Sequence, residues 1–263
     1  MLRSGTEPIR VTRGLTSPAR LPYSNLRHAR RPMFSQILCV AFDAVGTLIY
    51  PDPPVAEVYA RIGRKYGSEL SETEVGDRFR EAFHKMYSGR TATDEGLERW
   101  KWRMIVNLVF RFHEAEKTEN CFEELFEHFG QASSWRCYPD VEATLSELES
   151  RSLQLVLASN FDRRAHSICE GLAELAPLKT RVVSSEVGVH KPARGFYRAL
   201  LEQTGLVPER VLMVGDDWNN DVIGAMESGL KVVYLDRSLA PSNQRIQIAR
   251  TIHSLTELLE LLP

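Results

Sequence analysis

The chain has 263 residues, of which 43% are hydrophobic and 26% are charged. Its 33 basic and 35 acidic side chains give a net charge of -2 at pH 7. This composition is typical of a globular protein with one large domain or two smaller ones, and the balanced charge argues against nucleic acid or an anionic membrane as the main partner. No apolar run approaches the roughly 20 residues that a membrane-spanning helix needs.

Residues 1–32 differ in composition from the rest of the chain. They contain seven arginines but a single acid, Glu7, and four prolines interrupt them. An arginine-rich, acid-poor leader is typical of an organelle transit peptide. We prefer the interpretation of an over-extended start, with Met33 as the natural initiator. We therefore expect a basic, disordered leader and a cytoplasmic protein, with an organelle as the alternative if the leader is a transit peptide.

The next part of the chain predicts one buried strand followed by a block of helices. Residues 37–42 are continuously apolar, which is the pattern of a strand covered on both faces. From Pro54 onward the apolar residues recur at helical spacing, and Ser71 with Glu74 predicts a capping box at the start of the second helix. No strand-like stretch interrupts this block, so we expect an all-helical segment over residues 51–137.

Beyond residue 137, predicted helices and strands alternate. The strands are expected at residues 153–158, 181–184, 211–214 and 231–235, and the helices at 141–150, 163–172, 193–204, 221–228 and 254–262. Such alternation predicts a parallel sheet with helices on both faces, joined by right-handed crossovers. The expected fold is therefore α/β: a Rossmann-like core of residues 36–50 and 138–263, with an all-helical cap of residues 51–137 inserted after the first strand.

Polar residues follow the predicted strands. They are Asp43, Ser159, Asn160, Lys191, Asp216, Asp217 and Asp221. In open α/β sheets ligands bind at the carboxyl ends of the strands, so we expect these side chains to converge on one crevice.

Each of these residue types has a physical role in phosphoryl transfer. A carboxylate such as Asp43 can attack phosphorus and form an acyl phosphate that water then hydrolyses. Ser159 can donate a hydrogen bond to the phosphoryl oxygens, and Lys191 can neutralise charge on the nucleophile and the phosphoryl group. Acids such as Asp216 and Asp221 suit Mg²⁺, which prefers oxygen ligands. The strand ends therefore predict a metal-assisted phosphoryl-transfer site.

Four segments resemble the four ordered motifs of the haloacid dehalogenase superfamily. They are residues 43–48 (DAVGTL), Ser159-Asn160, Lys191-Pro192 and residues 215–221 (GDDWNND). One such motif alone is a weak signal, but four in order, each after a predicted strand, are a strong one. The resemblance covers residues 36–262, and the helical insertion is similar to that of the C1-capped group. Residues 159–164 (SNFDRR) and 98–100 (ERW) resemble the subgroup named after rhythmically expressed gene 2.

The resemblance implies roles for individual residues. Asp43 is expected to be the nucleophile, assisted by Lys191 and Ser159. The expected substrate-binding residues are Ser159, Asn160 and Thr47. The expected Mg²⁺ ligands are Asp43, the backbone carbonyl of Val45, Asp216 and Asp221. Asp217 is expected to cap the following turn, and the implied partner is a small, phosphorylated substrate.

The first motif departs from the family at Val45. Most phosphatases of the superfamily have a second aspartate there, which protonates the leaving group, whereas valine cannot transfer a proton. General acid–base catalysis is typically worth roughly 10²–10⁴-fold in rate. An ordinary alkyl phosphate should therefore be hydrolysed slowly or not at all.

Three interpretations stay open. The first is a Mg²⁺-dependent hydrolase of acyl or aryl phosphates, or one with an acid from the cap, for which His84 and Glu57 are candidates. The second is a metal-free 2-haloacid dehalogenase, whose halide leaves without a proton. The third is a catalytically weak member kept as a binding or regulatory protein. We favour the first over the second, because the fourth motif of the dehalogenases has a single acid where this chain has Asp216 and Asp217 as well as Asp221.

The cap sets substrate specificity in this superfamily, but its lining cannot be read from periodicity. Trp100 and Trp102 lie on different faces of one predicted helix. We expect one of them in the interior of the cap and the other near the substrate or the core. His190 is interpreted as a bystander. The sequence predicts neither the particular substrate nor the oligomeric state.

Overall fold

The computed structural model describes residues 1, 32–89, 91–238 and 248–263. Residues Arg31–Pro263 form one compact unit. The basic leader expected over residues 1–32 lies outside the described residues, apart from its two end residues. Within the described part of the chain, no helix is both long and apolar enough to cross a membrane.

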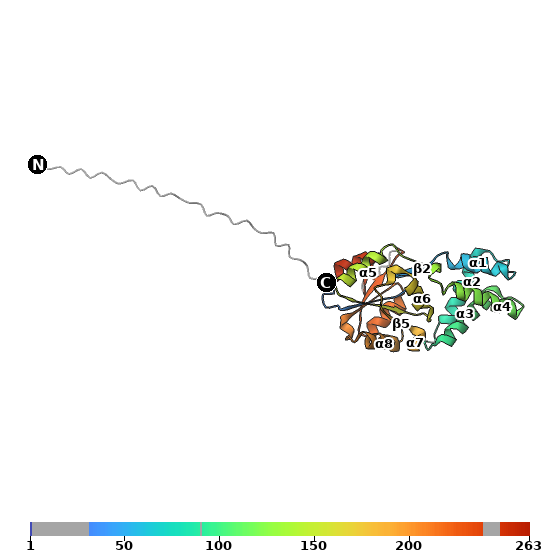
Figure 1. Ribbon diagram of the computed structural model, residues 1–263. Helices are drawn as coiled ribbons and strands as arrows, with labels where there is room; N and C mark the ends of the chain where they lie inside the picture. The colour runs from blue at the N-terminus through green and yellow to red at the C-terminus, as the bar shows by residue number, and fades with distance from the viewer. Residues whose placement is uncertain (2–31, 90, 239–247) are drawn as a thin grey trace. The chain divides into compact units, whose positions relative to one another are not determined.

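The centre of the molecule is a six-stranded sheet in the order β5-β4-β1-β6-β7-β8 (Figure 1). Its strands are β1 (Cys39–Phe42), β4 (Gln154–Ser159), β5 (Thr180–Val183), β6 (Val211–Gly215), β7 (Lys231–Leu235) and β8 (Arg250–Ile252). Every neighbouring pair is parallel. The first strand of the chain, β1, lies between β4 and β6, so it has hydrogen-bonded neighbours on both sides. The predicted α/β fold is confirmed.

Side chains of the central strands alternate between two hydrophobic cores, one on each face of the sheet. In β1, Val40 and Phe42 belong to one core, and Cys39 and Ala41 to the other. The first face is covered by α5 (Val141–Ser150), α6 (Arg164–Gly171) and α10 (Leu258–Leu261), and the second by α8 (Arg194–Thr204) and α9 (Gly224–Glu227). Burial on both faces explains why the strand is continuously apolar.

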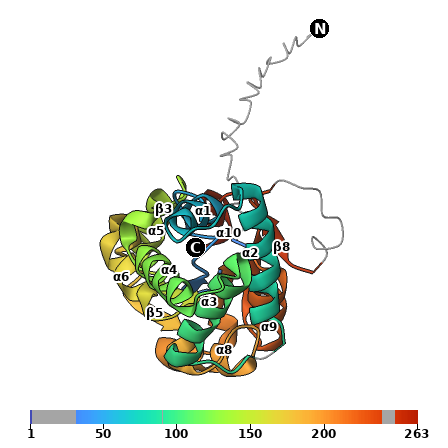
Figure 2. The ribbon, with the colours of Figure 1, turned by 90° about the vertical axis from the view of Figure 1, so that its right-hand side faces the viewer.

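A bundle of four helices, called the helical bundle here, is inserted between β1 and β4. Its members are α1 (Val55–Lys65), α2 (Glu72–Tyr87), α3 (Glu95–Phe110) and α4 (Ala115–His128). The bundle has a hydrophobic core of its own. The capping box of Ser71 and Glu74 opens α2 as expected, and Asp94 caps α3 by accepting a hydrogen bond from the backbone N–H of Leu97. Figure 2 views the bundle from outside, with its helices in front of the sheet.

A short antiparallel ribbon joins the bundle to the rest of the chain. It consists of β2 (Ile49–Pro51) and β3 (Trp135–Cys137), which pair as Ile49↔Cys137 and Pro51↔Trp135. The chain enters the bundle after one strand and leaves it before the other. The sequence pattern did not predict this ribbon, because three-residue strands are too short to show alternation.

Several boundaries differ from the predicted ones. Ser159 is the last residue of β4 and does not follow it, and the helix expected from residue 221 begins three residues earlier as a π-helix, Trp218–Ile223. The edge strand β8 was not predicted. The remaining short elements are α7 (Ser184–Val187) and the 3-10 turns Ala132–Ser134, Ala173–Leu175, Pro208–Arg210 and Leu255–Glu257.

Candidate active site

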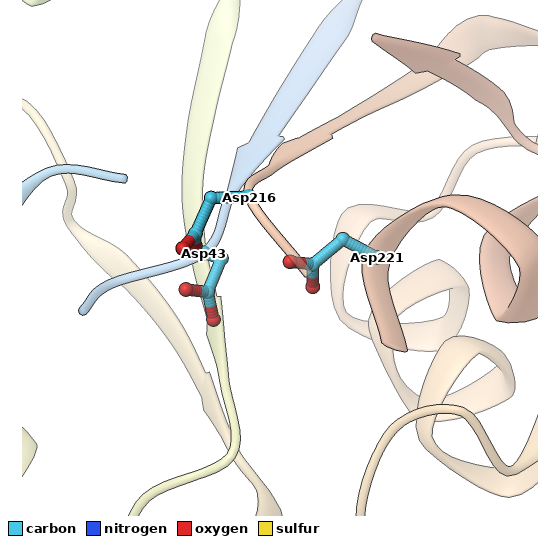
Figure 3. A group of neighbouring side chains, drawn as sticks. All are labelled: Asp43, Asp216 and Asp221. Carbon is cyan, nitrogen blue, oxygen red and sulfur yellow. The ribbon is translucent and has the colours of Figure 1, made fainter. Parts of the chain in front are cut away.

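Three carboxylates meet at the carboxyl ends of the central strands. Asp43 directly follows β1, Asp216 directly follows the neighbouring strand β6, and Asp221 lies in the first turn of the π-helix. One oxygen of each lies within 4.8 Å of an oxygen of the others. Figure 3 shows the three side chains pointing toward one another from these separate segments. We call Asp43, Asp216 and Asp221 the acidic cluster.

Two glycines make room for the acidic cluster. Gly46 has φ +89°, and a Cβ atom at this position would lie 2.2 Å from Oδ2 of Asp216. A Cβ atom at Gly215 would lie 2.2 Å from Oδ2 of Asp221. Any larger residue would therefore displace a carboxylate, and at position 46 it would also adopt a strained backbone conformation.

Lys191 is the cation that holds the cluster together. Its Nζ donates hydrogen bonds to Asp43 Oδ1, Asp221 Oδ1 and the backbone oxygen of Ala158, each at 2.7 Å. The residue is only 3% exposed. Asn160 fixes its backbone, because the Asn160 amide donates to the Lys191 carbonyl at 3.0 Å and accepts from the Lys191 N–H at 2.7 Å. Lys191 thus bridges Asp43 and Asp221, and each of the three residues comes from a separate segment of the chain.

The acidic cluster carries more negative charge than one lysine can balance. Burial and the nearby Asp43 raise the pKa of Asp216, and burial is also the main reason why the pKa of Asp221 is raised. Burial acts to lower the pKa of Lys191, but Asp221 and Asp43 outweigh it and the pKa is raised. Lys191 therefore stays charged, while the carboxylates favour the uptake of a proton or a cation.

Thr47 occupies a different place from the expected one. It is fully buried and does not line the cavity described below, and its hydroxyl donates to Asp216 Oδ1 at 3.1 Å. Thr47 therefore orients an acid, and the prediction of direct substrate contact is corrected. The cause is the tight turn at Gly46, which brings the threonine under Asp216.

The other expected residues lie around the cluster. Ser159 and Val45 both line the cavity, and Val45 is 38% exposed. Asp217 caps the π-helix, as expected, because its carboxylate accepts the backbone N–H groups of Asn219 and Asn220, both at 2.9 Å. Asp217 is not part of the acidic cluster.

A buried polar group links the helical bundle to the segment that carries Lys191. His190 Nε2 lies 2.8 Å from Glu98 Oε1, and the same oxygen accepts from Lys101 at 2.8 Å. Tyr87 donates to the other Glu98 oxygen at 2.7 Å. Although burial acts to raise it, these hydrogen bonds lower the pKa of Glu98 to about 2.

His190 is therefore no bystander, and that interpretation is corrected. It connects α3 of the bundle to the residue next to Lys191. The sequence gives no signal for this contact, because Glu98 and His190 are 92 positions apart.

A cavity of about 600 Å³ lies over the acidic cluster, lined by residues of the sheet edge and of the helical bundle. Ten aromatic side chains line it. Six of them are half-buried: Phe79, Tyr87, Trp102, Phe126, Phe129 and Phe161. Trp102 thus lines the cavity, whereas Trp100 is 48% exposed and does not. Trp102 also packs against the hydrophobic core of the bundle, so one tryptophan combines the two positions that were expected of different ones. His84 and Glu57 are exposed and also lie outside the lining.

A parallel sheet with acids at its strand ends and a helical insertion after its first strand defines a protein of the haloacid dehalogenase class. A family model described as haloacid dehalogenase-like hydrolase matches residues 37–229. The chain belongs to this family and is a hydrolase of the haloacid dehalogenase superfamily, as the four motifs predicted.

The relatives that are similar in sequence include the following two. The haloacid dehalogenase-like hydrolase domain-containing protein 3 of Mus musculus is 28% identical over 204 residues, which cover 74% of this chain and 80% of that protein. The phosphoserine phosphatase of Thermus thermophilus is 36% identical over 118 residues, which cover 44% of this chain and 47% of that protein.

Solved structures agree in fold. The HAD-hydrolase YfnB of Bacillus subtilis, bound to magnesium, matches with a TM-score of 0.68 at 15% identity, covering 85% of this chain and 97% of that one. A dehalogenase matches with a TM-score of 0.66 at 18% identity, covering 87% of this chain and 98% of that one. Identities this low show the fold alone.

Proposed function

We propose that this chain is a Mg²⁺-dependent phosphohydrolase in which Asp43 is the nucleophile. The observation that carries the proposal is the cluster of Asp43, Asp216 and Asp221 at the ends of parallel strands, with a buried lysine bonded to Asp43 and Asp221. The partial sequence similarity to a phosphoserine phosphatase supports phosphate monoesters as the substrate class.

The acidic cluster suits a divalent cation. Its oxygens lie within 4.8 Å of one another, and carboxylate oxygens are the ligands that Mg²⁺ prefers. The raised pKa values of Asp216 and Asp221 reflect a negative charge that one lysine does not balance and a cation would. We propose that these two acids, Asp43 and the backbone carbonyl of Val45 hold Mg²⁺, which when bound draws negative charge from the phosphoryl oxygens.

The side chains of the site have separate roles in the proposed reaction. Asp43 attacks phosphorus and forms an aspartyl phosphate, which water hydrolyses in the second half of the reaction. Lys191, at 2.7 Å from Asp43 Oδ1, neutralises charge that develops on the carboxylate and the phosphoryl group. The Ser159 hydroxyl donates a hydrogen bond to a phosphoryl oxygen, and Asn160 positions the Lys191 backbone.

The helical bundle is proposed to act as the cap that closes over this site, with the expected boundaries of residues 51–137. Two observations support this assignment. The cavity is lined by residues of the bundle together with Asp43 and Lys191, and the His190–Glu98 contact joins the two parts beside the lysine. Closure of the cap would exclude water from the reacting phosphoryl group.

The substrate range is proposed to be limited to leaving groups that need little protonation, such as acyl and aryl oxygens. Val45 cannot supply a proton. Among the described residues that line the cavity, the carboxylic acids are Asp43, Asp216, Asp217 and Asp221, and all of them come from the sheet edge. Neither of the two candidate acids of the bundle reaches the cavity.

A panel of substrates tests this proposal. Release of phosphate from p-nitrophenyl phosphate, acetyl phosphate and sugar phosphates is measured with Mg²⁺ and with chelator, and release of chloride from 2-chloropropionate alongside. We expect Mg²⁺-dependent hydrolysis of the first two, abolished by Asp43→Asn. Val45→Asp should extend turnover to sugar phosphates, with a gain on the order of 10²–10⁴-fold.

Two outcomes would contradict the proposal. Chloride release without a metal would identify a dehalogenase. Absence of turnover in the wild type, together with activity in Val45→Asp, would identify a binding or regulatory protein that has lost its catalytic acid.

A further inference from the structure

The helical bundle contributes a connected aromatic surface to the cavity. The ring centroid of Phe83 lies 4.6 Å from that of Tyr87 and 6.0 Å from that of Trp102. The guanidinium of Arg164 extends this surface, because its Cζ lies 5.8 Å from the Trp102 centroid and 3.6 Å from the Phe126 centroid. Flat rings and a planar guanidinium together bind a flat aromatic ligand by stacking and edge contacts.

This aromatic surface reaches the catalytic end of the cavity. Arg164 Cζ also lies 5.8 Å from the centroid of Phe161, which directly follows Ser159 and Asn160 in the chain. A ligand whose phosphoryl group lies at the acidic cluster can therefore place a ring against the aromatic surface.

The charges of the lining argue against a second anionic group on the ligand. Arg164 donates to both carboxylate oxygens of the buried Asp162, at 2.8 and 2.7 Å, and so its charge is balanced. Lys191 is bound by two acids. Among the described lining residues, neither of these cations is left for a second anionic group such as a carboxylate.

The size of the cavity and the absence of an acid at position 45 narrow the chemical class of the substrate further. A volume of about 600 Å³ lies within the range of about 300–1,000 Å³ of pockets for drug-sized ligands. A phenolic oxygen has a pKa of about 10 and leaves as a phenolate with little need of a proton donor. An aryl ester has a leaving group that needs no acid at position 45 and a ring that fits the aromatic surface. An aliphatic acyl phosphate has only such a leaving group.

We infer that the substrate is a phosphate monoester of an uncharged, hydrophobic phenol, whose ring binds against Trp102, Tyr87 and Phe126. The inference rests on the proposed phosphohydrolase function. Asp43 forms a bond to phosphorus while the bond from phosphorus to the aryl oxygen breaks and its electron pair leaves with the phenolate. Water then attacks the aspartyl phosphate, which releases inorganic phosphate and Asp43, and the phenolate takes a proton from solvent.

Four substrates separate the effect of the ring from that of the leaving group. With the full-length protein and Mg²⁺, the test compares 2-naphthyl phosphate (the naphthyl ester), acetyl phosphate, 2-phenylethyl phosphate and ethyl phosphate. Acetyl phosphate has a good leaving group without a ring, and 2-phenylethyl phosphate has a ring with a poor one. We expect the naphthyl ester to have a KM about tenfold or more below that of acetyl phosphate. Neither alkyl ester should be turned over unless Val45→Asp is present.

Two tryptophans of α3 provide a matched pair of variants. Trp102 lines the cavity, and Trp100 lies two positions away on the exposed surface. Trp102→Ala should raise the KM for the naphthyl ester about five- to tenfold relative to the KM for acetyl phosphate, and circular dichroism checks that the variant is folded. Trp102→Phe should restore most of the affinity for the naphthyl ester. Trp100→Ala should change the KM for neither substrate.

Different experimental results would overturn the aromatic site and the proposed phosphohydrolase function. Equal KM values for the naphthyl ester and acetyl phosphate, both insensitive to Trp102→Ala, would overturn the aromatic site while leaving a phosphatase. If no substrate is hydrolysed, calorimetric titration with 2-naphthylmethylphosphonate decides the matter. Binding that is weakened by Trp102→Ala supports the aromatic site without the reaction, and absence of binding overturns it.

Discussion

In the metal-free protein, the acidic cluster should lower the free energy of unfolding as the pH rises. The Asp216→Asn substitution should remove much of this decrease. Burial and Asp43 raise the pKa of Asp216 from 3.8 to about 7. The unfolded chain releases this proton near pH 4, whereas the folded chain retains it until about pH 7. Stability is therefore lost progressively between these two values, because the unfolded state ionises first.

The magnitude follows from the shift in pKa. About three units at 1.36 kcal/mol each give a cost on the order of 4 kcal/mol above pH 7. Asparagine has nearly the same shape and can still accept the Thr47 hydrogen bond, but it does not ionise. In chelator, the Asp216→Asn variant should equal the wild type in stability near pH 4 and exceed it by up to about 4 kcal/mol at pH 8. For a chain of this size, that difference corresponds to a Tm about 8 °C higher.

Unfolding by guanidinium at pH 4, 6 and 8, with and without Mg²⁺, measures the pH dependence of stability and the stabilisation by the metal. Mg²⁺ at 100 times its Kd should stabilise the wild type by about 2.7 kcal/mol at pH 8 and the variant by much less. Asp217→Asn is the matched control, because asparagine caps a helix as well as aspartate does and the residue lies outside the acidic cluster. Stabilities of wild type and Asp216→Asn that run parallel from pH 4 to 8 would refute the reasoning.

Two further predictions concern the frame of the site. Gly46→Ala should lower the free energy of unfolding by about 1–3 kcal/mol, since its φ of +89° disfavours a side chain, and it should abolish phosphate release by displacing Asp216; thermal unfolding and activity check both. Glu98→Gln should cost roughly 3–5 kcal/mol at pH 7, because it leaves Lys101 buried without its partner. Since the folded pKa of Glu98 is lowered to about 2, this cost should shrink as the pH falls from 5 toward 2, and denaturation curves that show the same cost at pH 7 and pH 2.5 would contradict it.

The fold was predictable where burial imposes a period on the sequence. The strand β1 has both faces covered, so all four of its residues are buried and the apolar run is unmistakable. The helices of the bundle bury one face against a shared core, which produces the helical spacing. The ribbon β2–β3 and the strand β8 have three residues each, too few for any period, and their pairing depends on partners distant in the chain.

The candidate site was predictable to the same extent. Asp43 and Asp216 follow neighbouring parallel strands, so topology alone brings them together. The partner of Thr47 depends on the course of a tight turn, and the contact of His190 with Glu98 depends on how the bundle packs on the sheet edge. Neither follows from spacing or periodicity, because each is decided by tertiary structure.

Val45 makes physical sense in the site that surrounds it. An aspartate here would add a fourth carboxylate beside three, of which only Asp43 and Asp221 are paired with Lys191, and would raise the cost of ionising each of them. Valine adds no charge, and its 38% exposed side chain continues the apolar lining of the cavity toward the catalytic end. The same residue that removes the proton donor therefore favours an apolar group beside the reacting phosphate. A phenolic phosphate ester suits both conditions, because its leaving group needs no proton donor and its ring is apolar.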